Sequence, residues 1–160
     1  MTINGCRSIY FGSSMNDQLL KQGVGALVYS TTTNRYLFLL RNGAKYSGTW
    51  GMVGGKIEGN ERVIVALNRE IIEEIGVDLS HNKTIPIETF TSADRHFIYY
   101  SFVIVVEHEF IPALNHEHRG YCWVNIKDHP KPLHPGVWKT FNFKSVISKI
   151  DTLEHVLRSH

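Results

Sequence analysis

The segment from Asn60 to Gly76 constrains the fold most, because it predicts one helix with an acidic face and an apolar face. Glu70, Glu73 and Glu74 stand at positions i, i+3 and i+4, so a helix places their carboxylates side by side. The opposite face carries Val63, Ala66, Leu67, Ile71 and Ile75. These apolar residues would dock the helix on a core. Asn60 is suited to begin such a helix and Gly76 to end it.

Clustered carboxylates repel one another, so the acidic face needs positive charge nearby. Arg69 precedes Glu73 by one helical turn and can pair with it, but a surplus of negative charge remains. Oxygen ligands of this kind suit Mg²⁺ or Mn²⁺, and Mg²⁺ commonly binds a few carboxylates together with phosphate and water. No Cys or His stands at ligand spacing beside them, which argues against zinc. A divalent metal site is therefore favoured over a solvated acidic helix end.

The same residues resemble the Nudix box. Its specified positions match Gly55, Glu61, the run Arg69–Glu74 and Gly76, and such a spacing of fixed residue types rarely arises by chance. The order of the surrounding elements extends the resemblance roughly from residue 21 to residue 157. It implies an α/β fold, the Nudix-type α/β/α sandwich with a mixed central β-sheet between helices. One Nudix hydrolase domain is expected over residues 1–160.

Apolar runs of strand length surround the box. They occupy residues 22–29, 35–41, 50–53, 84–91, 96–107 and 120–124. A turn-like Ser-Thr-Thr-Thr-Asn segment joins the first two and predicts a hairpin. Residues 137–158 carry Val146, Ile150, Leu153 and Leu157 at helical spacing, so one amphipathic closing helix is expected.

The composition of the chain indicates which partners and which cellular location to expect. The net charge of +2 points to neither a nucleic-acid footprint nor a membrane patch. Two cysteines, Cys6 and Cys122, are too few for a disulfide framework, and no secretory signal or spanning segment is recognisable. A reduced, cytoplasmic location is expected. Residues 1–20 form an N-terminal extension, which predicts an extra edge strand, a homodimer contact or a loosely attached arm.

The resemblance also implies roles for the acidic residues. In Nudix enzymes the glutamates that match Glu70 and Glu74 bind metal, and the one that matches Glu73 binds metal or orients the attacking water. The backbone carbonyl of the glycine that matches Gly54 commonly completes the metal site. The implied cofactor is Mg²⁺, with Mn²⁺ as a possible replacement.

Further residues are expected to support the site or contact phosphate. Glu61 and Arg69 resemble the pair that holds the loop and the carboxylates in register. Lys56 follows the glycines and Arg41 ends the second predicted strand, so both could bind phosphate; an ordinary surface role is the alternative for each. Many Nudix proteins have proline before the paired glycines, whereas this chain has Val53, and this difference removes no ligand.

A polar loop before Trp123 contains two more candidates. A glutamate or histidine in this region often supplies a metal ligand or general base in the family, so Glu117 and His118 are both candidates, against the alternative of a merely polar loop. His118 also resembles the base of the GDP-mannose-hydrolysing branch, which lacks part of the acidic box. Further along, His134 or Trp138 could stack on a nucleobase, and a plain connector is the alternative there.

The expected function is Mg²⁺-dependent pyrophosphohydrolysis by water attack at phosphorus. The substrate is expected to be a nucleoside diphosphate linked to another moiety, such as ADP-ribose, a dinucleoside polyphosphate or a modified nucleoside triphosphate. Two alternatives stay open, a nucleotide-sugar glycosyl hydrolase of the GDP-mannose type and a non-catalytic nucleotide-binding Nudix module. The complete acidic set favours an enzyme. The expected partner is a nucleotide-derived small molecule rather than a nucleic acid or a membrane.

Overall fold

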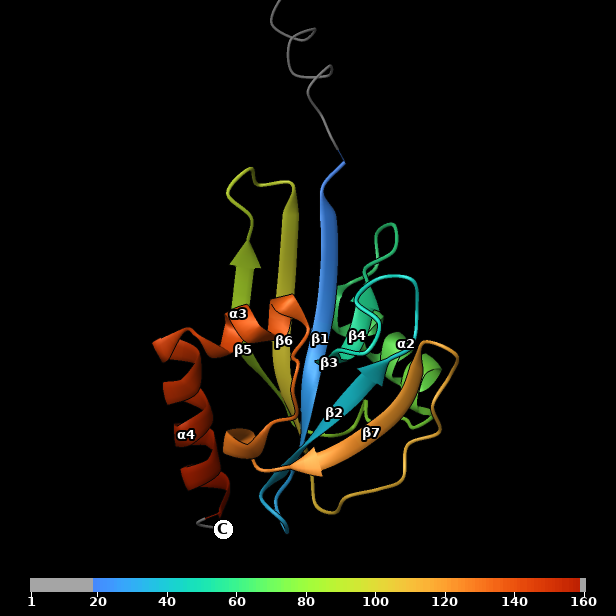
Figure 1. The fold of residues 1–160 in the computed structure, drawn as a ribbon. Coiled ribbons are helices and arrows are strands. Elements are labelled where there is room, and N and C mark those ends of the chain that lie inside the picture. Colours follow the sequence, from blue (N-terminus) through green and yellow to red (C-terminus); the bar gives the residue numbers. More distant parts are fainter. Residues whose placement is uncertain (1–18, 159–160) are drawn as a thin grey trace, which may run out of the picture.

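The computed structural model describes residues 19–158, which form three layers (Figure 1). Seven strands make one mixed sheet: β1 (Lys21–Ser30), β2 (Arg35–Arg41), β3 (Trp50–Gly51), β4 (Val53–Lys56), β5 (Thr84–Thr91), β6 (Phe97–Val106) and β7 (His118–Val124). Helix α2 (Val63–Ile75) packs on one face. Helices α3 (Pro135–Phe141) and α4 (Lys144–Arg158) cover the other, and the short helix η1 (Ile126–Asp128) follows β7. The expected α/β/α sandwich with a mixed sheet is confirmed.

Strand β1 lies at the centre of the sheet. It pairs in parallel with β6 over its whole length, and β5 continues the sheet in the antiparallel direction. Along its other edge, β1 pairs first with β4 and then, from Tyr29 onward, with β2. The strand order is β3-β2-β1-β6-β5, with β7 on β2. Because β4 takes the first half of this edge, the glycines of β4 lie beside the middle of the sheet.

Each face of the sheet contributes to a separate core. Ala26 and Val28 of β1 pack with α2, whereas Leu27 and Tyr29 pack with α3 and α4. All four are completely buried, which explains why β1 is a continuous apolar run instead of an alternating one. Among residues 19–158, no helix is long and apolar enough to cross a membrane.

The box helix begins later than its sequence indicates. Val63 is its first residue, and Arg62 precedes it in an extended conformation without a side-chain cap. Asn60 therefore does not begin the helix, and that expectation is wrong. Glu61 supplies a hydrogen bond in the loop instead, since its carboxylate accepts from the backbone N–H of Glu58 at 2.8 Å. Gly76 ends the helix as expected, with φ of 68° in the left-handed region.

The expected single helix over residues 137–158 is two helices, α3 and α4. The buried stripe of α3 contains Val137 and Thr140 and would continue along one straight helix to residues 144 and 147. The buried residues of α4 are instead Val146 and Ile150. A break between the helices lets both stripes face the sheet. Asn142 caps the end of α3 there, and its side chain donates to the Trp138 carbonyl at 3.0 Å.

Two strand boundaries also differ. The expected strand at residues 50–53 is divided into β3 and β4, and β7 begins at His118, earlier than residue 120. The expectations for residues 1–18 of the extension lie outside the described part of the chain.

Candidate functional site

The three glutamates of α2 have different environments. Glu74 is 2% exposed and Glu70 is 8% exposed, so the fold buries both carboxyl groups. The Glu73 side chain is 54% exposed and pairs with Arg69 at 3.3 Å. The shared helical face predicted from their spacing is present, but only two of the three acids point into the protein.

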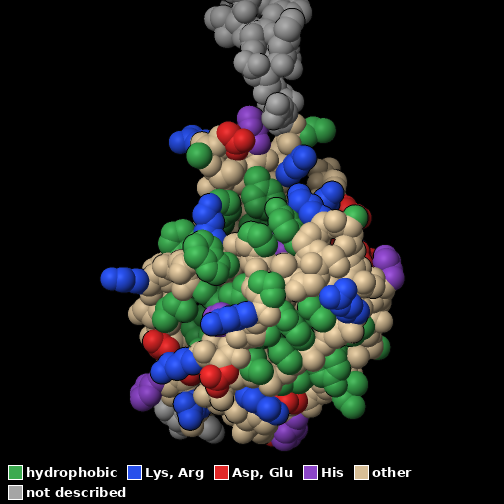
Figure 2. Space-filling view, in the orientation of Figure 1, with side chains coloured by type: hydrophobic (Ala, Val, Ile, Leu, Met, Phe, Trp, Pro, Cys, Tyr) green, Lys and Arg blue, Asp and Glu red, His purple; other side chains and the backbone are tan. Residues whose placement is uncertain are grey.

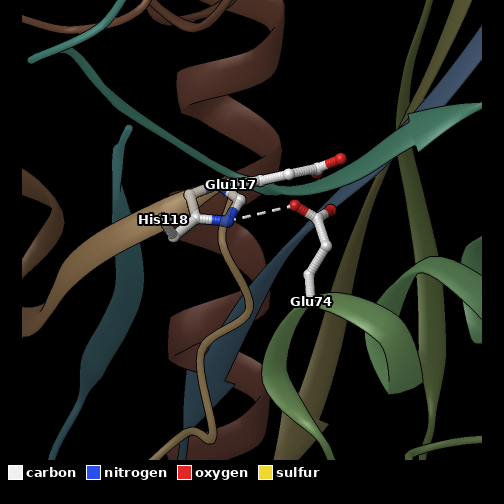
Figure 3. A group of neighbouring side chains, drawn as sticks. All are labelled: Glu74, Glu117 and His118. Carbon is white, nitrogen blue, oxygen red and sulfur yellow. Dashed lines mark ion pairs between the residues drawn. The ribbon is translucent and has the colours of Figure 1, made fainter. Parts of the chain in front are cut away.

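Glu74 lies at the centre of a group of possible metal ligands (Figure 3). Its Oε2 is 3.2 Å from Nδ1 of His118, and both side chains are 2% exposed. Glu117, from the loop just before β7, directs its carboxylate to the same side. One ligand atom of each of the three residues lies within 4.8 Å of the others. Both loop candidates, Glu117 and His118, are thus beside Glu74, and the fold brings His118 to α2 from a distant strand.

Backbone and glycine contacts hold the two buried acids in place. The N–H of Gly54 donates to Oε1 of Glu74 at 2.8 Å. A Cβ on Gly55 would collide with the carboxyl group of Glu70, and a Cβ on Gly54 would collide with the backbone of β1. Both positions therefore require glycine because of close approach. The expected role of the Gly54 carbonyl as a metal ligand stays a prediction.

Burial makes the charged forms of Glu74 and His118 unfavourable. Desolvation raises the pKa of Glu74 to about 9, and the nearby charges of Glu70 and Glu117 add to that effect. Burial, with a smaller contribution from Arg41, lowers the pKa of His118 to about 4. The Nδ1 atom of His118 accepts or donates no hydrogen bond within the described residues. A buried imidazole nitrogen without a hydrogen bond, 3.2 Å from a carboxylate whose charged form burial disfavours, fits a divalent cation.

Arg69 connects the helix with the loop before it. It donates to both carboxylate oxygens of Glu61, at 2.9 and 2.8 Å, and to the Lys56 carbonyl at 3.0 Å. A further hydrogen bond of 3.0 Å reaches Glu70. The hydrogen bonds from Arg69 are the main reason that the pKa of Glu61 is lowered to about 2. The predicted Glu61–Arg69 pairing is present in the structure.

A cavity of about 230 Å³ lies on the α3 side of the sheet, beside Gly54 and Gly55. Its apolar lining residues are Met52, Phe90, Phe97, Tyr99, Val137 and Phe143. Its polar lining residues are Arg41, Glu88, His134, Lys139 and Thr140. The cavity also reaches Gly54 and Gly55, whose other contacts are Glu74 and Glu70. The cavity and the buried acids therefore meet at the two glycines of β4, which contact both.

The remaining predicted residues lie partly at the cavity and partly at the surface. Arg41 lines the cavity and lowers the pKa of both Glu74 and His118, so it lies near the acidic group. His134 also lines the cavity, whereas Trp138 is 61% exposed and does not line it. The Lys56 side chain is exposed.

Sequence reasoning missed the residues that form the cavity floor. A Cβ on Gly23 would approach the Tyr99 ring to 2.7 Å, so this ring lies close over β1. Phe90 pairs with Tyr99 across β5 and β6, and Glu88 lies on the same strand. Strand periodicity alone does not mark such residues, because their convergence depends on pairing between distant segments.

Known proteins are similar to this chain in sequence and in fold. The family model of the NUDIX domain matches residues 19–142. A dihydroneopterin triphosphate diphosphatase from Haemophilus influenzae is 34% identical over 121 residues, which cover 66% of this chain and 75% of that protein. The nucleoside triphosphatase NudI of Escherichia coli is 34% identical over 94 residues, which cover 52% of this chain and 66% of that protein.

A solved structure agrees with the architecture. The crystal structure of a MutT NUDIX hydrolase from Burkholderia pseudomallei superposes with a TM-score of 0.61 at 24% identity, and covers 81% of this chain and 98% of that one. The likeness shows the same fold. Together with the family match over most of the chain and the complete acidic box, it shows that this protein belongs to the Nudix hydrolase family.

Proposed function

We propose that Glu70, Glu74 and Glu117, with His118, hold Mg²⁺ and that the protein hydrolyses a phosphoric anhydride bond of a nucleotide-derived substrate. The observation that supports this most directly is the meeting of Glu74, Glu117 and His118 within 4.8 Å, where burial and two further carboxylates raise the pKa of Glu74 to about 9. Bound divalent metal would neutralise phosphate oxygens and lower the pKa of a water nucleophile. Mn²⁺ is the natural substitute because a histidine is among the donors.

The chain's own residues prepare this chemistry. The Gly54 N–H orients Glu74, and Arg69 orients Glu70 through a 3.0 Å hydrogen bond. Arg41 lines the cavity and acts electrostatically on Glu74 and His118, and its guanidinium can pair with phosphate in two-pronged geometry. Glu117 is exposed and belongs to the same group, so it is our preferred proton acceptor. Glu73 and Lys56 lie at the exposed edge of the site, and we assign them auxiliary roles.

The substrates of the relatives guide the choice of substrate class. One relative is named for dihydroneopterin triphosphate and another for nucleoside triphosphates. We propose that this chain likewise acts on the triphosphate or diphosphate of a nucleoside-like compound, with phosphates at Gly54 and Gly55 and the ring system in the apolar cavity. Attack at phosphorus is favoured over the GDP-mannose type because the acidic box is complete.

A substrate panel with metal titration tests the proposal. Nucleoside triphosphates, ADP-ribose, dinucleoside polyphosphates and GDP-mannose would be incubated with Mg²⁺ or Mn²⁺, and phosphate-containing products identified. We expect metal-dependent turnover of at least one anhydride and a loss of orders of magnitude in Glu74→Gln. Glu107→Gln is the matched control, since the Glu107 side chain is exposed and pairs with His108, away from the site. Near-normal turnover in folded Glu74→Gln would refute the metal assignment.

A further inference from the structure

Glu88 is the one acidic residue among the described residues that line the cavity. Arg41 and Lys139 supply the opposite charge, and Phe90 and Tyr99 supply aromatic surface. Hydrophobic side chains gather on this face over β6 and β1, with basic side chains around them (Figure 2). A carboxylate repels phosphate and accepts hydrogen bonds from donors. A part of a ligand that carries N–H or O–H groups would therefore complement Glu88.

A β-bulge directs Glu88 toward this cavity. Strands β5 and β6 pair regularly as far as Pro86 with Phe102, and then Glu88, not Ile87, pairs with Ser101. Ile87 is 1% exposed and packs in the core beneath α3 and α4. Since side chains alternate along a strand, an unbulged Glu88 would point to the α2 core. The extra residue turns Glu88 to the cavity side, which is a known use of bulges near binding sites.

Helix α3 holds the carboxylate in position. The buried hydroxyl of Thr140 donates to Oε1 of Glu88 at 3.0 Å. Among residues 19–158, the other oxygen, Oε2, has no hydrogen-bond partner. The carboxylate is therefore oriented by the protein while retaining the capacity to accept donors from a ligand.

One row of paired residues connects Glu88 with the phosphate end of the site. Glu88 pairs with Ser101, Ser101 with Gly25, and Gly25 with Gly54. Three strand spacings of about 4.8 Å separate β5 from β4, about 14 Å in total. This is the scale of a nucleotide from its phosphates to the far edge of its base. Phosphates near Gly54 would thus place the heterocycle edge near Glu88.

We propose that Glu88 determines specificity by selecting a heterocycle with adjacent ring N–H and exocyclic amino donors, the 2-amino-4-oxopyrimidine edge of guanine and pterins. A carboxylate accepts these two parallel donors together. Adenine presents a ring nitrogen acceptor at this position, hypoxanthine lacks the amino group, and xanthine presents a second carbonyl. This inference rests on the proposed function for the location of the phosphates.

Single-group changes in the substrate test the inference without altering the protein. GTP, ITP, XTP, ATP and dihydroneopterin triphosphate would be compared by kcat/KM with Mg²⁺. We expect GTP or dihydroneopterin triphosphate to exceed ITP by about tenfold or more, and XTP and ATP to be poorer still. The ratio of kcat/KM for GTP to kcat/KM for dihydroneopterin triphosphate identifies which ring system the cavity prefers. Equal use of GTP, ITP and ATP would overturn the assignment.

The variant Glu88→Gln then locates the selectivity. It keeps the shape but replaces one acceptor with a donor, so the preference for GTP over ITP should fall by about tenfold or more, to near equal use. Glu107→Gln is the matched control and should retain the wild-type preference. An unchanged preference in folded Glu88→Gln would overturn the role of this residue. The wild type would also be assayed with dGTP, which lacks the ribose 2′-hydroxyl. If its kcat/KM fell as much as that of Glu88→Gln with GTP, Glu88 would bind the ribose, and its role in base selection would be overturned.

A binding measurement separates this inference from the proposed hydrolysis. Calorimetry with GMP, IMP and AMP reports base selection whether or not any substrate is hydrolysed. We expect GMP to bind more tightly than IMP in the wild type and equally in Glu88→Gln. If the protein bound GMP selectively but hydrolysed no substrate, only the proposed function would be refuted. If it hydrolysed substrates without selecting a base, only the role of Glu88 would be refuted.

Discussion

At the scale of single residues, Glu74 is placed where its ionised form is unfavourable. It is 2% exposed, and its nearest charged neighbours include Glu70 and Glu117. The Gly54 N–H and Arg41 offset this cost only in part, since the pKa still rises to about 9. A protein retains such a residue when the charge is needed for binding, which agrees with a cation-dependent site.

The raised pKa predicts how metal-free protein responds to pH. The stability that comes from neutral Glu74 is complete below its ordinary pKa of 4.5 and is lost as pH rises toward about 9. Glu74→Gln cannot ionise, so its melting temperature should fall less than that of the wild type between pH 6.5 and 9. In that range His118, whose pKa is lowered to about 4, stays neutral in the folded protein. Parallel melting curves for the two proteins would contradict this.

Metal addition provides the complementary measurement. At pH 8, Mg²⁺ should raise the melting temperature of the wild type because it binds the folded state alone. Glu74→Gln should show a much smaller rise, and Glu107→Gln should behave as the wild type.

Glu117 and His118 can be separated by kinetics. Burial lowers the pKa of His118 to about 4, so it is a weak proton acceptor at neutral pH. Glu117 is exposed and contributes negative charge to the same group. We expect Glu117→Gln to reduce kcat more than His118→Asn, measured across a pH series. If His118→Asn abolished turnover and removed the acidic limb while Glu117→Gln had little effect, the base would be His118.

At the scale of elements, the loop between β4 and α2 takes its shape from the helix that follows it. Arg69 of α2 binds both oxygens of Glu61 and the carbonyl of Lys56, and so closes the loop onto the helix. The pKa of Glu61 is about 2, below its ordinary value. Its contribution to stability is present above pH 4.5 and is lost as pH falls toward about 2. The loop therefore stays closed at neutral pH.

Replacement of Arg69 tests this connection. Arg69→Lys keeps the charge but cannot reach Glu61, Glu70 and the Lys56 carbonyl together. We expect kcat/KM to fall by about 10- to 100-fold, with more Mg²⁺ needed for half-maximal activity. Arg62→Lys is the matched control, because Arg62 is exposed and adjoins the same helix. An unchanged metal requirement in Arg69→Lys would show that the loop does not position the acids.

At the scale of the whole molecule, the site lies where the two layers of helices approach the same part of the sheet. Helix α2 supplies the acids from one side, and α3 closes the cavity from the other. The glycines of β4 lie between them, since Gly54 contacts Glu74 and also lines the cavity. In the proposed function, the acids would thus face phosphates at Gly54 and Gly55 rather than a sugar ring.

The position of bond cleavage follows from that arrangement. Hydrolysis in ¹⁸O-labelled water should place the label on a phosphate-containing product, because the acidic group activates water toward phosphorus. Mass spectrometry of the products distinguishes this from label on a sugar carbon. The latter outcome would assign the protein to the glycosyl-hydrolysing type, with His118 as its base.

The local sequence pattern was sufficient to predict most of the helices and strands and the faces that they bury. The faces of α2, the left-handed Gly76 and the strands β1, β2, β5 and β6 follow from side-chain periodicity and turn chemistry, which act within a few residues. The spacing of residues from Gly55 to Gly76 is by itself enough to indicate the family and the acids. The first residue of α2 was not predictable, because Glu61 is taken up by the loop and Arg62 has no capping side chain.

Only the tertiary structure decided how distant segments complete the site. His118 meets Glu74 because β7 pairs with β2, and Glu88 faces the cavity because one extra residue in β5 reverses the alternation of its side chains. The break between α3 and α4 likewise depends on the sheet that both helices cover. Periodicity is a property of neighbouring residues, so it determines each element and its faces. Strand pairing, register and the bulge determine which faces meet, and those are set by long-range packing.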